Sequence, residues 1–262
     1  MKFCSLFSGS SGNCNYISTG NTSILVDAGL SGKRIQGEMA KIEADPKTID
    51  GIFVTHEHSD HIQGVGILSR RFDLPIYASR KTWDAMICKL GKINEENIRY
   101  IEADKAVDIK GLSITPFNIS HDAVEPFGFN VTDGMKKISL LTDTGCINDY
   151  IRNMVANFDL LLLETNHDVE LLKVGSYPWS LKRRVMGEYG HLSNETAGEF
   201  LVDVMKGEGE CVYLGHLSQE NNFPELAKRT VTNILVENKI NLDKEIIIEM
   251  THRDRCSSIK IL

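Results

Sequence analysis

The chain has 262 residues, of which 42% are hydrophobic and 25% charged, and its formal net charge at pH 7 is −7. No Pro/Ser-rich linker or long charge run divides it, so we expect one domain over residues 1–262. No apolar stretch approaches the roughly 20 residues that span a bilayer, and the apolar run after Lys2 is too short for a signal peptide. We therefore expect a cytoplasmic protein with no membrane partner. The acidic balance excludes general attraction to nucleic acid, which would need a local basic patch.

The six cysteines are scattered and contain no CxxC pair. This distribution argues against a Cys-based zinc site and against a disulfide framework. We expect most of them to be small buried apolar residues.

The hydrophobic pattern predicts alternating strands and helices. The first half predicts strands at 1–7, 15–17, 22–27, 51–55 and 74–78, a Gly/Ser turn at 8–13, and helices at 33–42, 62–72 and 82–90. The next region predicts strands at 98–101, 106–109, 112–119, 128–131 and 137–141. The last part predicts helices at 147–158, 196–205 and 225–236, with strands at 160–163, 211–214 and 245–249. This order suggests two sheets covered by helices.

The densest group of metal-ligand side chains is the sequence HEHSDH at residues 56–61. It directly follows the apolar strand predicted at 51–55. His56 and His58 are two residues apart and face the same way on an extended segment. Asp60 and His61 come where the chain would bend into a helix. One group can hold one metal ion and the other a second, and imidazole favours Zn, Fe, Mn or similar ions.

This HxHxDH pattern resembles the signature of the metallo-β-lactamase superfamily. The segments FSGSSGNC at 7–14, SHDA at 120–123, LTDTG at 141–145 and GHLSN at 190–194 resemble its WalJ/YycJ-type branch, described as DNA 5′→3′ exonucleases. The resemblance implies an α/β fold of the four-layer αββα sandwich type, with metals at one edge between the sheets. The hydrophobic pattern alone does not choose this layering over another α/β arrangement.

The resemblance also implies a ligand set. A first metal ion would be held by His56, His58 and His121, a second by Asp60, His61 and His216, with Asp143 bridging the two. Asp143 and His216 each follow a predicted strand, and Gly145 would let the chain turn away sharply. A lone His after a strand is usually structural, but the complete ordered set favours two divalent ions, with Zn, Mn and Fe all open.

Two such ions depress the pKa of a water held between them and bind the oxygens of the bond under attack. This chemistry suits hydrolysis of phosphodiesters and also of lactams or thioesters. In nuclease branches of the superfamily, a His in a motif like HLS at 191–193 lies beside the scissile phosphate and protonates the leaving oxygen. We therefore assign His191 and Asp60 as catalytic residues, with Glu164 orienting His191.

Two segments of the second half could bind the substrate. Ser193 and Asn194 begin a helix, where they would act as caps or also contact a phosphate. Lys182, Arg183 and Arg184 form the densest basic run, downstream of Tyr177 and Trp179, whose rings could stack on bases. Charge runs are more often solvated surface, so this role stays open.

The Gly/Ser loop is the third candidate for substrate binding. Its residues Ser8, Ser10, Ser11 and Asn13 could form a backbone nest for a terminal phosphate. A tight turn between two strands explains the same composition equally well. His167 and His252 match no motif, and we expect both to be structural.

The leading hypothesis is a metal-dependent nuclease acting on DNA, by resemblance a 5′→3′ exonuclease. The alternatives are a small-nucleotide phosphodiesterase, an RNA-processing nuclease, a thioester hydrolase of the glyoxalase II type and a non-catalytic metal-bound scaffold. The interval between Asp143 and His216 is too short for the large inserted clamp domain of some RNA-cleaving relatives. The sequence leaves the oligomeric state open.

Overall fold

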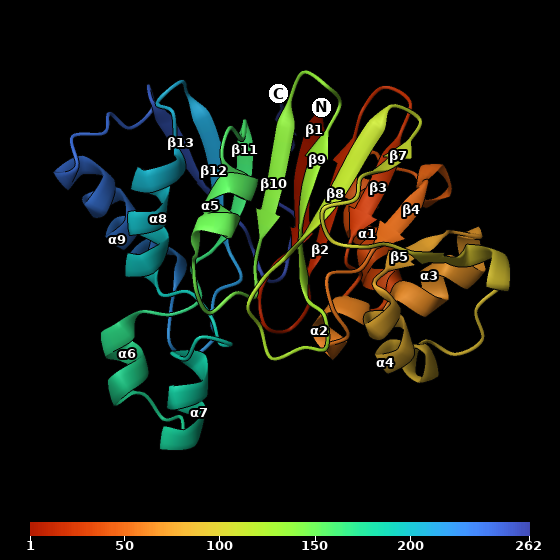
Figure 1. The fold of residues 1–262 in the computed structure, drawn as a ribbon, viewed down its shortest axis with the longest axis horizontal. Helices are drawn as coiled ribbons and strands as arrows, with labels where there is room; N and C mark the ends of the chain where they lie inside the picture. Colours follow the sequence, from red (N-terminus) through yellow and green to blue (C-terminus); the bar gives the residue numbers. More distant parts are fainter.

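Two mixed β-sheets face each other in the computed structural model, which describes residues 1–262 (Figure 1). The first sheet has the order β14-β1-β2-β3-β4-β5-β6. Its strands are β1 (Lys2–Phe7), β2 (Cys14–Ser18), β3 (Ser23–Val26), β4 (Gly51–Phe53), β5 (Ile76–Ala78), β6 (Ile98–Tyr100) and β14 (Lys260–Ile261). The second has the order β13-β12-β11-β10-β9-β8-β7. Its strands are β7 (Val107–Ile109), β8 (Leu112–Asn118), β9 (Phe127–Thr132), β10 (Lys137–Leu141), β11 (Leu160–Glu164), β12 (Glu210–Gly215) and β13 (Ile246–Met250).

Helices cover the outer face of each sheet. The first sheet is covered by α1 (Gly32–Lys41), α3 (Val65–Phe72) and α4 (Arg80–Leu90), and the second by α5 (Asp149–Val155), α8 (Asn194–Val204) and α9 (Pro224–Glu237). This arrangement confirms the predicted αββα sandwich. Three short helices, α2 (Ser59–Ile62), α6 (Val169–Val174) and α7 (Trp179–Val185), lie at the end of the molecule opposite the chain termini (Figure 1). Single 3₁₀ turns occupy Pro46–Thr48 and Glu95–Asn97.

The layers are held together by three hydrophobic cores, which follow from the alternation of side chains along each strand. In β11, Leu160 and Leu162 point into the core between the sheets, whereas Leu161 and Leu163 pack against the helices of the second sheet. Burying each such leucine stabilises the fold by about 1.5–3 kcal/mol. Because one core joins both sheets, we propose that residues 1–262 fold as one domain.

The parallel strands bring distant polar residues to one edge. β3 and β4 pair in parallel, as do β10, β11 and β12. Parallel neighbours end at the same side of a sheet, so the residues that follow them gather there. Asp27 follows β3, Asp143 follows β10, Glu164 ends β11 and His216 follows β12. The His56–His61 segment follows β4 at the same edge.

The structure differs from the predicted elements at several points. The helix predicted at 62–72 is divided into α2 and α3 at Gly64, where an added Cβ would lie 2.2 Å from the carbonyl oxygen of Leu30. The helix predicted at 147–158 covers only 149–155, and α6, α7 and β14 were missed because each is shorter than two turns or a full strand. No helix is both long enough and apolar enough to cross a membrane.

Candidate metal centre

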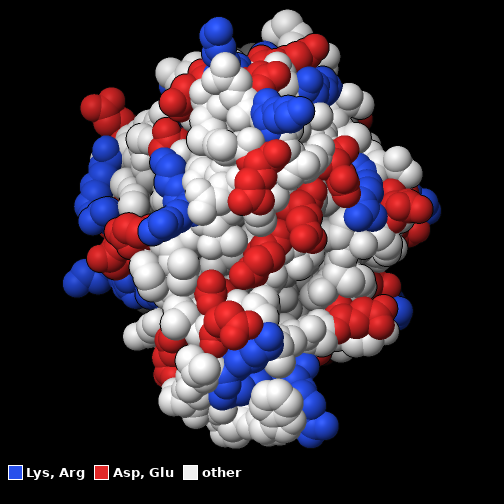
Figure 2. Space-filling view, turned by 90° about the vertical axis from the view of Figure 1, so that its left-hand side faces the viewer, with Lys and Arg blue, Asp and Glu red and all other residues white.

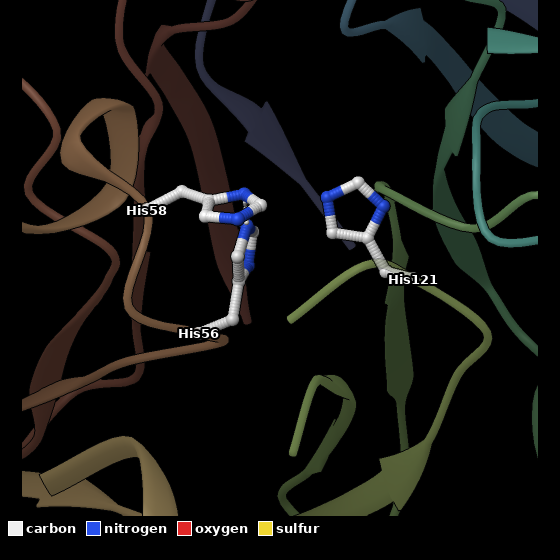
Figure 3. A group of neighbouring side chains, drawn as sticks. All are labelled: His56, His58 and His121. Carbon is white, nitrogen blue, oxygen red and sulfur yellow. Dashed lines mark hydrogen bonds between the residues drawn. The ribbon is translucent and has the colours of Figure 1, made fainter. Parts of the chain in front are cut away.

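Three imidazoles converge from two segments of the chain (Figure 3). Nε2 of His56 lies 3.0 Å from Nδ1 of His58, and His121 reaches them from the loop after β8. One ring nitrogen from each of the three lies within 4.8 Å of the others. Nδ1 of His121 donates to the carbonyl oxygen of Gly190 at 3.3 Å, which leaves its Nε2 facing the cluster. The three histidines predicted to share one metal ion are therefore together.

A second group of ligands adjoins the first through Asp143. Oδ2 of Asp143 lies 3.4 Å from Nε2 of His61, which is also 3.6 Å from Oδ2 of Asp60. Oδ1 of Asp143 lies 3.4 Å from Nε2 of His216 and 3.8 Å from Nε2 of His121. The carboxylate of Asp143 thus stands between the two groups, and one oxygen faces His61 while the other faces His121 and His216.

The chemical state of these residues fits a divalent metal ion. Oδ2 of Asp143 and Nε2 of His216 are buried and have no hydrogen-bond partner, a costly state that a cation would relieve. Burial and the neighbouring His61 hold the pKa of His56 well below its usual value, and burial lowers that of His121, so both imidazoles are neutral. Burial acts to raise the pKa of the Asp143 carboxyl, but His216 and the other histidines hold it well below its usual value.

Asp27 supports the metal centre by hydrogen bonds to His61 and Thr55, a role that the sequence did not predict. Nδ1 of His61 donates to Oδ2 of Asp27 at 2.7 Å. The backbone N–H of Thr55 donates to Oδ1 of Asp27 at 2.9 Å, and the Thr55 hydroxyl lies 2.9 Å from Nδ1 of His56. Burial opposes protonation of His61, but Asp27 and then Asp143 raise its pKa to about 10. The signal in the sequence that could have found Asp27 is a carboxylate directly after β3. This strand pairs in parallel with β4, which precedes the HEHSDH segment.

Glu164 supports the other side of the centre. Its Oε1 accepts hydrogen bonds from Nδ1 of His191 and Nδ1 of His216, both at 2.8 Å. Its Oε2 accepts from the backbone N–H groups of Thr144 at 3.0 Å and Leu192 at 3.3 Å. Burial acts to raise the pKa of Glu164, but His191 and His216 lower it to about 2. The carboxylate is therefore charged and fixes the orientation of both imidazoles.

His191 is the imidazole nearest to solvent on this side, with 20% of its side chain exposed. Its ring centroid lies 5.1 Å from that of His121 and 5.4 Å from that of His216. Burial acts to lower the pKa of His191, but Glu164 raises it to about 9. Because Nδ1 is bonded to Glu164, Nε2 is the nitrogen available to a substrate.

Three residues at the strand ends adopt the left-handed backbone region: Asp27 (φ 63), Asp143 (φ 57) and His216 (φ 55). Such residues cost about 1–3 kcal/mol each and persist where the surrounding structure requires them. The chain bends at Gly145, as predicted, and also at Asp143, which is the residue with the left-handed backbone. Gly145 is needed for space, since an added Cβ would lie 2.3 Å from the carbonyl oxygen of Glu188.

The Gly/Ser loop is a tight turn whose polar atoms are largely used inside the protein. The N–H of Gly9 donates to Oδ1 of Asn13 at 2.9 Å, and the N–H of Asn13 donates to the carbonyl oxygen of Asp60 at 2.8 Å. The Ser8 hydroxyl accepts from the N–H of His216 at 2.8 Å. These bonds place Ser8 and Asn13 as supports of the centre. Ser10 and Ser11 are exposed, and both hydroxyls face the Arg253 guanidinium.

Two members of the basic run have internal partners. Lys182 is buried, and its ammonium donates to the carbonyl oxygens of Lys173 and Gly175, both at 2.7 Å. This cation holds α6 against α7, so we leave Lys182 out of the proposed DNA contacts. Nε of Arg184 pairs with Asp122 beside the metal cluster, whereas Arg183 is exposed.

The HLSN segment begins α8 as predicted. The Ser193 hydroxyl accepts from the N–H of Thr196 at 3.1 Å and is the helix cap. Asn194 is fully buried, and its amide exchanges hydrogen bonds with the amide of Asn222. Its amide is therefore committed to a partner within the fold. His167 is also buried, and its carbonyl accepts from the N–H of Asn194, whereas His252 is half-buried.

Charge is unevenly distributed over the side of the molecule that carries α8 and α9. Figure 2 shows a diagonal band of Asp and Glu across this side, with Lys and Arg at its lower end and also along the left edge and at the top. The lower end corresponds to α6 and α7 in Figure 1. A polyanion would be repelled by this acidic band.

An αββα sandwich with this His/Asp cluster at its edge defines a metal-dependent hydrolase of the metallo-β-lactamase type. The family model described as "Beta-lactamase superfamily domain" matches residues 22–216, and the chain belongs to this family. It is 42% identical over 260 residues to exodeoxyribonuclease WalJ of Streptococcus pneumoniae, covering 98% of this chain and 97% of the relative. It is 40% identical to exodeoxyribonuclease YycJ of Bacillus anthracis over 237 residues, 90% of each chain.

A solved structure supports the fold alone. The Zn²⁺-bound PqqB of Methylobacterium extorquens has a TM-score of 0.73 at 16% identity, covering 98% of this chain and 100% of the other. At this identity the similarity concerns the fold and not the substrate. The similarity shows that the αββα arrangement recurs in that protein.

Proposed function

We propose that this protein is an exodeoxyribonuclease that uses two divalent metal ions, Zn, Mn or Fe, and degrades DNA from the 5′ end. The observation that carries the proposal is the similarity to WalJ and YycJ, which covers nearly the whole of both chains. The polarity rests on the resemblance of the sequence motifs to that branch. We also propose a cytoplasmic location, as expected from the sequence.

We propose the following ligands for the two ions. The first is held by His56, His58 and His121, the second by Asp60, His61 and His216, and Asp143 contacts both. When bound, such a pair lowers the pKa of water and stabilises the oxygens of an in-line phosphoryl displacement. Two observations support this assignment. Asp143 lies between the two groups, and Oδ2 of Asp143 and Nε2 of His216 are buried without a hydrogen-bond partner.

His191 is the proposed proton donor. Its Nδ1 is fixed by Glu164 at 2.8 Å, so Nε2 is directed to the open side of the cluster. A proton on Nε2 would pass to the leaving oxygen as the P–O bond breaks. Glu164 is a positioning residue, because it is fully buried and acts through His191 and His216. We propose that the Asp60 carboxylate, whose side chain is 24% exposed, orients the attacking water.

A cavity of the protein that includes Asp60 is a candidate binding site for the DNA backbone. This cavity of about 340 Å³ is lined by Ser10, Ser11, Ser59 and Lys89 among others. Lys89 was missed from the sequence, since α4 brings it from a segment with no motif. We propose that Lys89 and the two loop serines contact phosphates on this side of the metals. Arg183 and Arg184 remain proposed contacts on the side of α7, and the Ser193 hydroxyl a weaker one because it already caps α8.

Other substrates would use the same metal chemistry. Small phosphodiesters and RNA are the nearest alternatives, and thioesters are a more distant one. No observation of this structure favours them over DNA. An inert scaffold is disfavoured because every proposed ligand is present and its supporting hydrogen bonds are formed.

The test uses end-labelled DNA, single- and double-stranded, with and without a 5′-phosphate, and protein supplied with Mn²⁺ or Zn²⁺. We expect stepwise loss from the 5′ end that His58→Ala and Asp143→Ala both abolish. His252→Ala, a histidine outside the cluster, serves as the matched control. Parallel reactions contain RNA, a small phosphodiester and an acyl-glutathione thioester. Metal binding without DNA cleavage, or preferred cleavage of one of these three, would overturn the proposal.

A further inference from the structure

A small cavity opens directly beside His191 on the side of α6 and α7. Its volume is about 130 Å³, and Tyr177, Leu181 and Val185 supply its aromatic and aliphatic lining. Pockets for drug-sized molecules usually measure about 300–1,000 Å³, so this one suits a single planar ring system. His191 and Ser10 also line it, with Asp122, Arg184 and other polar residues. The cavity therefore combines an apolar part, made by Tyr177, Leu181 and Val185, with a polar one that includes His191.

Tyr177 is the only aromatic residue of this lining. Its side chain is half-buried, whereas Trp179, two residues along, is 59% exposed and does not line the cavity. Burial lowers the pKa of the Arg253 guanidinium, and the phenol of Tyr177 opposes that shift, so the two groups lie within electrostatic reach. Of the two aromatics that the sequence offered for base stacking, the structure brings Tyr177 to the metal centre.

The wall that carries Tyr177 is fixed by polar contacts at three points. Lys182 binds two carbonyl oxygens at the end of α6, and Arg184 pairs with Asp122 beside the metal cluster. Between the helices, the Ser176 hydroxyl donates to Oε2 of Glu220 at 2.7 Å. A preorganised wall loses little conformational entropy when a ligand binds. Lys182 and Arg184 of the basic run thus help to hold this wall in place.

The cavity continues into the rest of the proposed DNA path. Ser10 lines both this cavity and the larger one that contains Asp60 and Lys89. The loop that carries Ser10 therefore separates a hydroxyl- and lysine-lined side from a side with an aromatic ring. Bases stack on aromatic rings and phosphates bind cations, so a strand crossing the metals would present different groups to the two sides.

We propose that the pocket of Tyr177, Leu181 and Val185 binds the base of the nucleotide on the leaving-oxygen side of the scissile phosphate, which stacks on Tyr177. The assignment rests on the proposed function, because His191, the proposed donor to the leaving oxygen, borders the same pocket. For digestion from the 5′ end, this nucleotide is the terminal one that is released. Tyr177 is then a substrate-binding residue that requires a base at this position but does not distinguish one base from another.

The test compares Tyr177→Ala and Tyr177→Phe with wild type on two oligodeoxynucleotides. One has a normal terminal nucleotide, and the other has an abasic site at that position. On normal DNA, Tyr177→Ala should lower kcat/KM by roughly 5- to 100-fold, mainly through KM, as expected from loss of one base–aromatic stack. On abasic DNA the same variant should match wild type within about twofold. Tyr177→Phe should behave as wild type on both, because the ring face makes the contact.

The matched control is Tyr100→Ala, which replaces an exposed tyrosine on β6. This variant should leave kcat/KM unchanged on both substrates. If Tyr177→Ala lowered kcat/KM equally on both substrates, the base pocket would be overturned, because the effect would then be structural. Anisotropy of the labelled oligonucleotides with chelated protein gives a readout that does not depend on cleavage. Binding that depends on the base through Tyr177, without any hydrolysis, would support the pocket and overturn the nuclease. Absence of binding to either oligonucleotide would overturn both.

Discussion

Replacing Glu164 by glutamine tests the support of the metal centre with almost no change in shape. The two carboxylate oxygens have separate duties: one accepts from two histidines, and the other accepts from the backbone N–H groups of Thr144 and Leu192. Glutamine has an oxygen for only one of these duties. If that oxygen faces His191 and His216, the amide NH₂ faces two buried N–H donors that lose their acceptor.

The magnitude follows from these contacts. An unsatisfied buried donor costs about 1–3 kcal/mol, so two donors predict that Glu164→Gln lowers the free energy of unfolding by about 2–6 kcal/mol. The reverse orientation would direct the NH₂ at His216 and disturb its tautomer. Loss of such a partner of a metal ligand typically lowers metal affinity about 10- to 100-fold.

Urea unfolding of the chelated protein measures the first effect, and competition with a metal indicator measures the second. Glu170→Gln, in a residue whose side chain is 78% exposed, is the control and should stay within about 0.5 kcal/mol of wild type. A Glu164→Gln protein that unfolds like wild type and binds metal with unchanged affinity would refute the reasoning.

Three further predictions concern the parts around the centre. Because the pKa of His61 is about 10, metal binding to the chelated protein near neutral pH should release a proton from His61. Asp27→Asn should reduce this release, which calorimetry measures in buffers of different ionisation enthalpy. Equal release would contradict the pairing. Gly29→Ala places a Cβ 1.6 Å from a backbone carbonyl oxygen in α2 and should cost at least about 3 kcal/mol in urea unfolding, whereas Gly20→Ala meets nothing within 4 Å and should be neutral. Lys182→Met removes two charge-assisted hydrogen bonds of about 1.5–3 kcal/mol each and should speed limited proteolysis between α6 and α7, and unchanged cleavage would count against this role.

The basic run shows where sequence reasoning reaches its limit. Consecutive cations near a suspected site predict a phosphate contact equally for each residue. In the structure, Lys182 turns inward to the end of α6, Arg184 pairs with Asp122, and Arg183 is exposed. The direction of each side chain depends on short helices that the hydrophobic pattern did not reveal.

Asp27 illustrates the same limit for the metal centre. Asp27 accepts a hydrogen bond from His61, which is far away in the sequence. Only the parallel pairing of β3 with β4 brings the two side chains together. Likewise, Gly145 suggested a turn and the chain does bend there, but the residue with the left-handed backbone is Asp143. Local composition indicates that a chain bends without deciding which residue carries the strain.

The sequence by itself determined the HEHSDH segment and the alternation of strands and helices, whereas the αββα layering and the full ligand set followed from the resemblance to a known family. The spacing of HEHSDH is local, and strand ends that carry His or Asp are visible as apolar runs followed by polar residues. Only the tertiary structure revealed Asp27 and Lys89, because each acts with residues from another strand or helix. It also gave Glu164, which the resemblance assigned to His191, a second partner in His216. Contacts between distant segments depend on strand order and on the meeting of parallel strand ends at one edge, which no local pattern encodes.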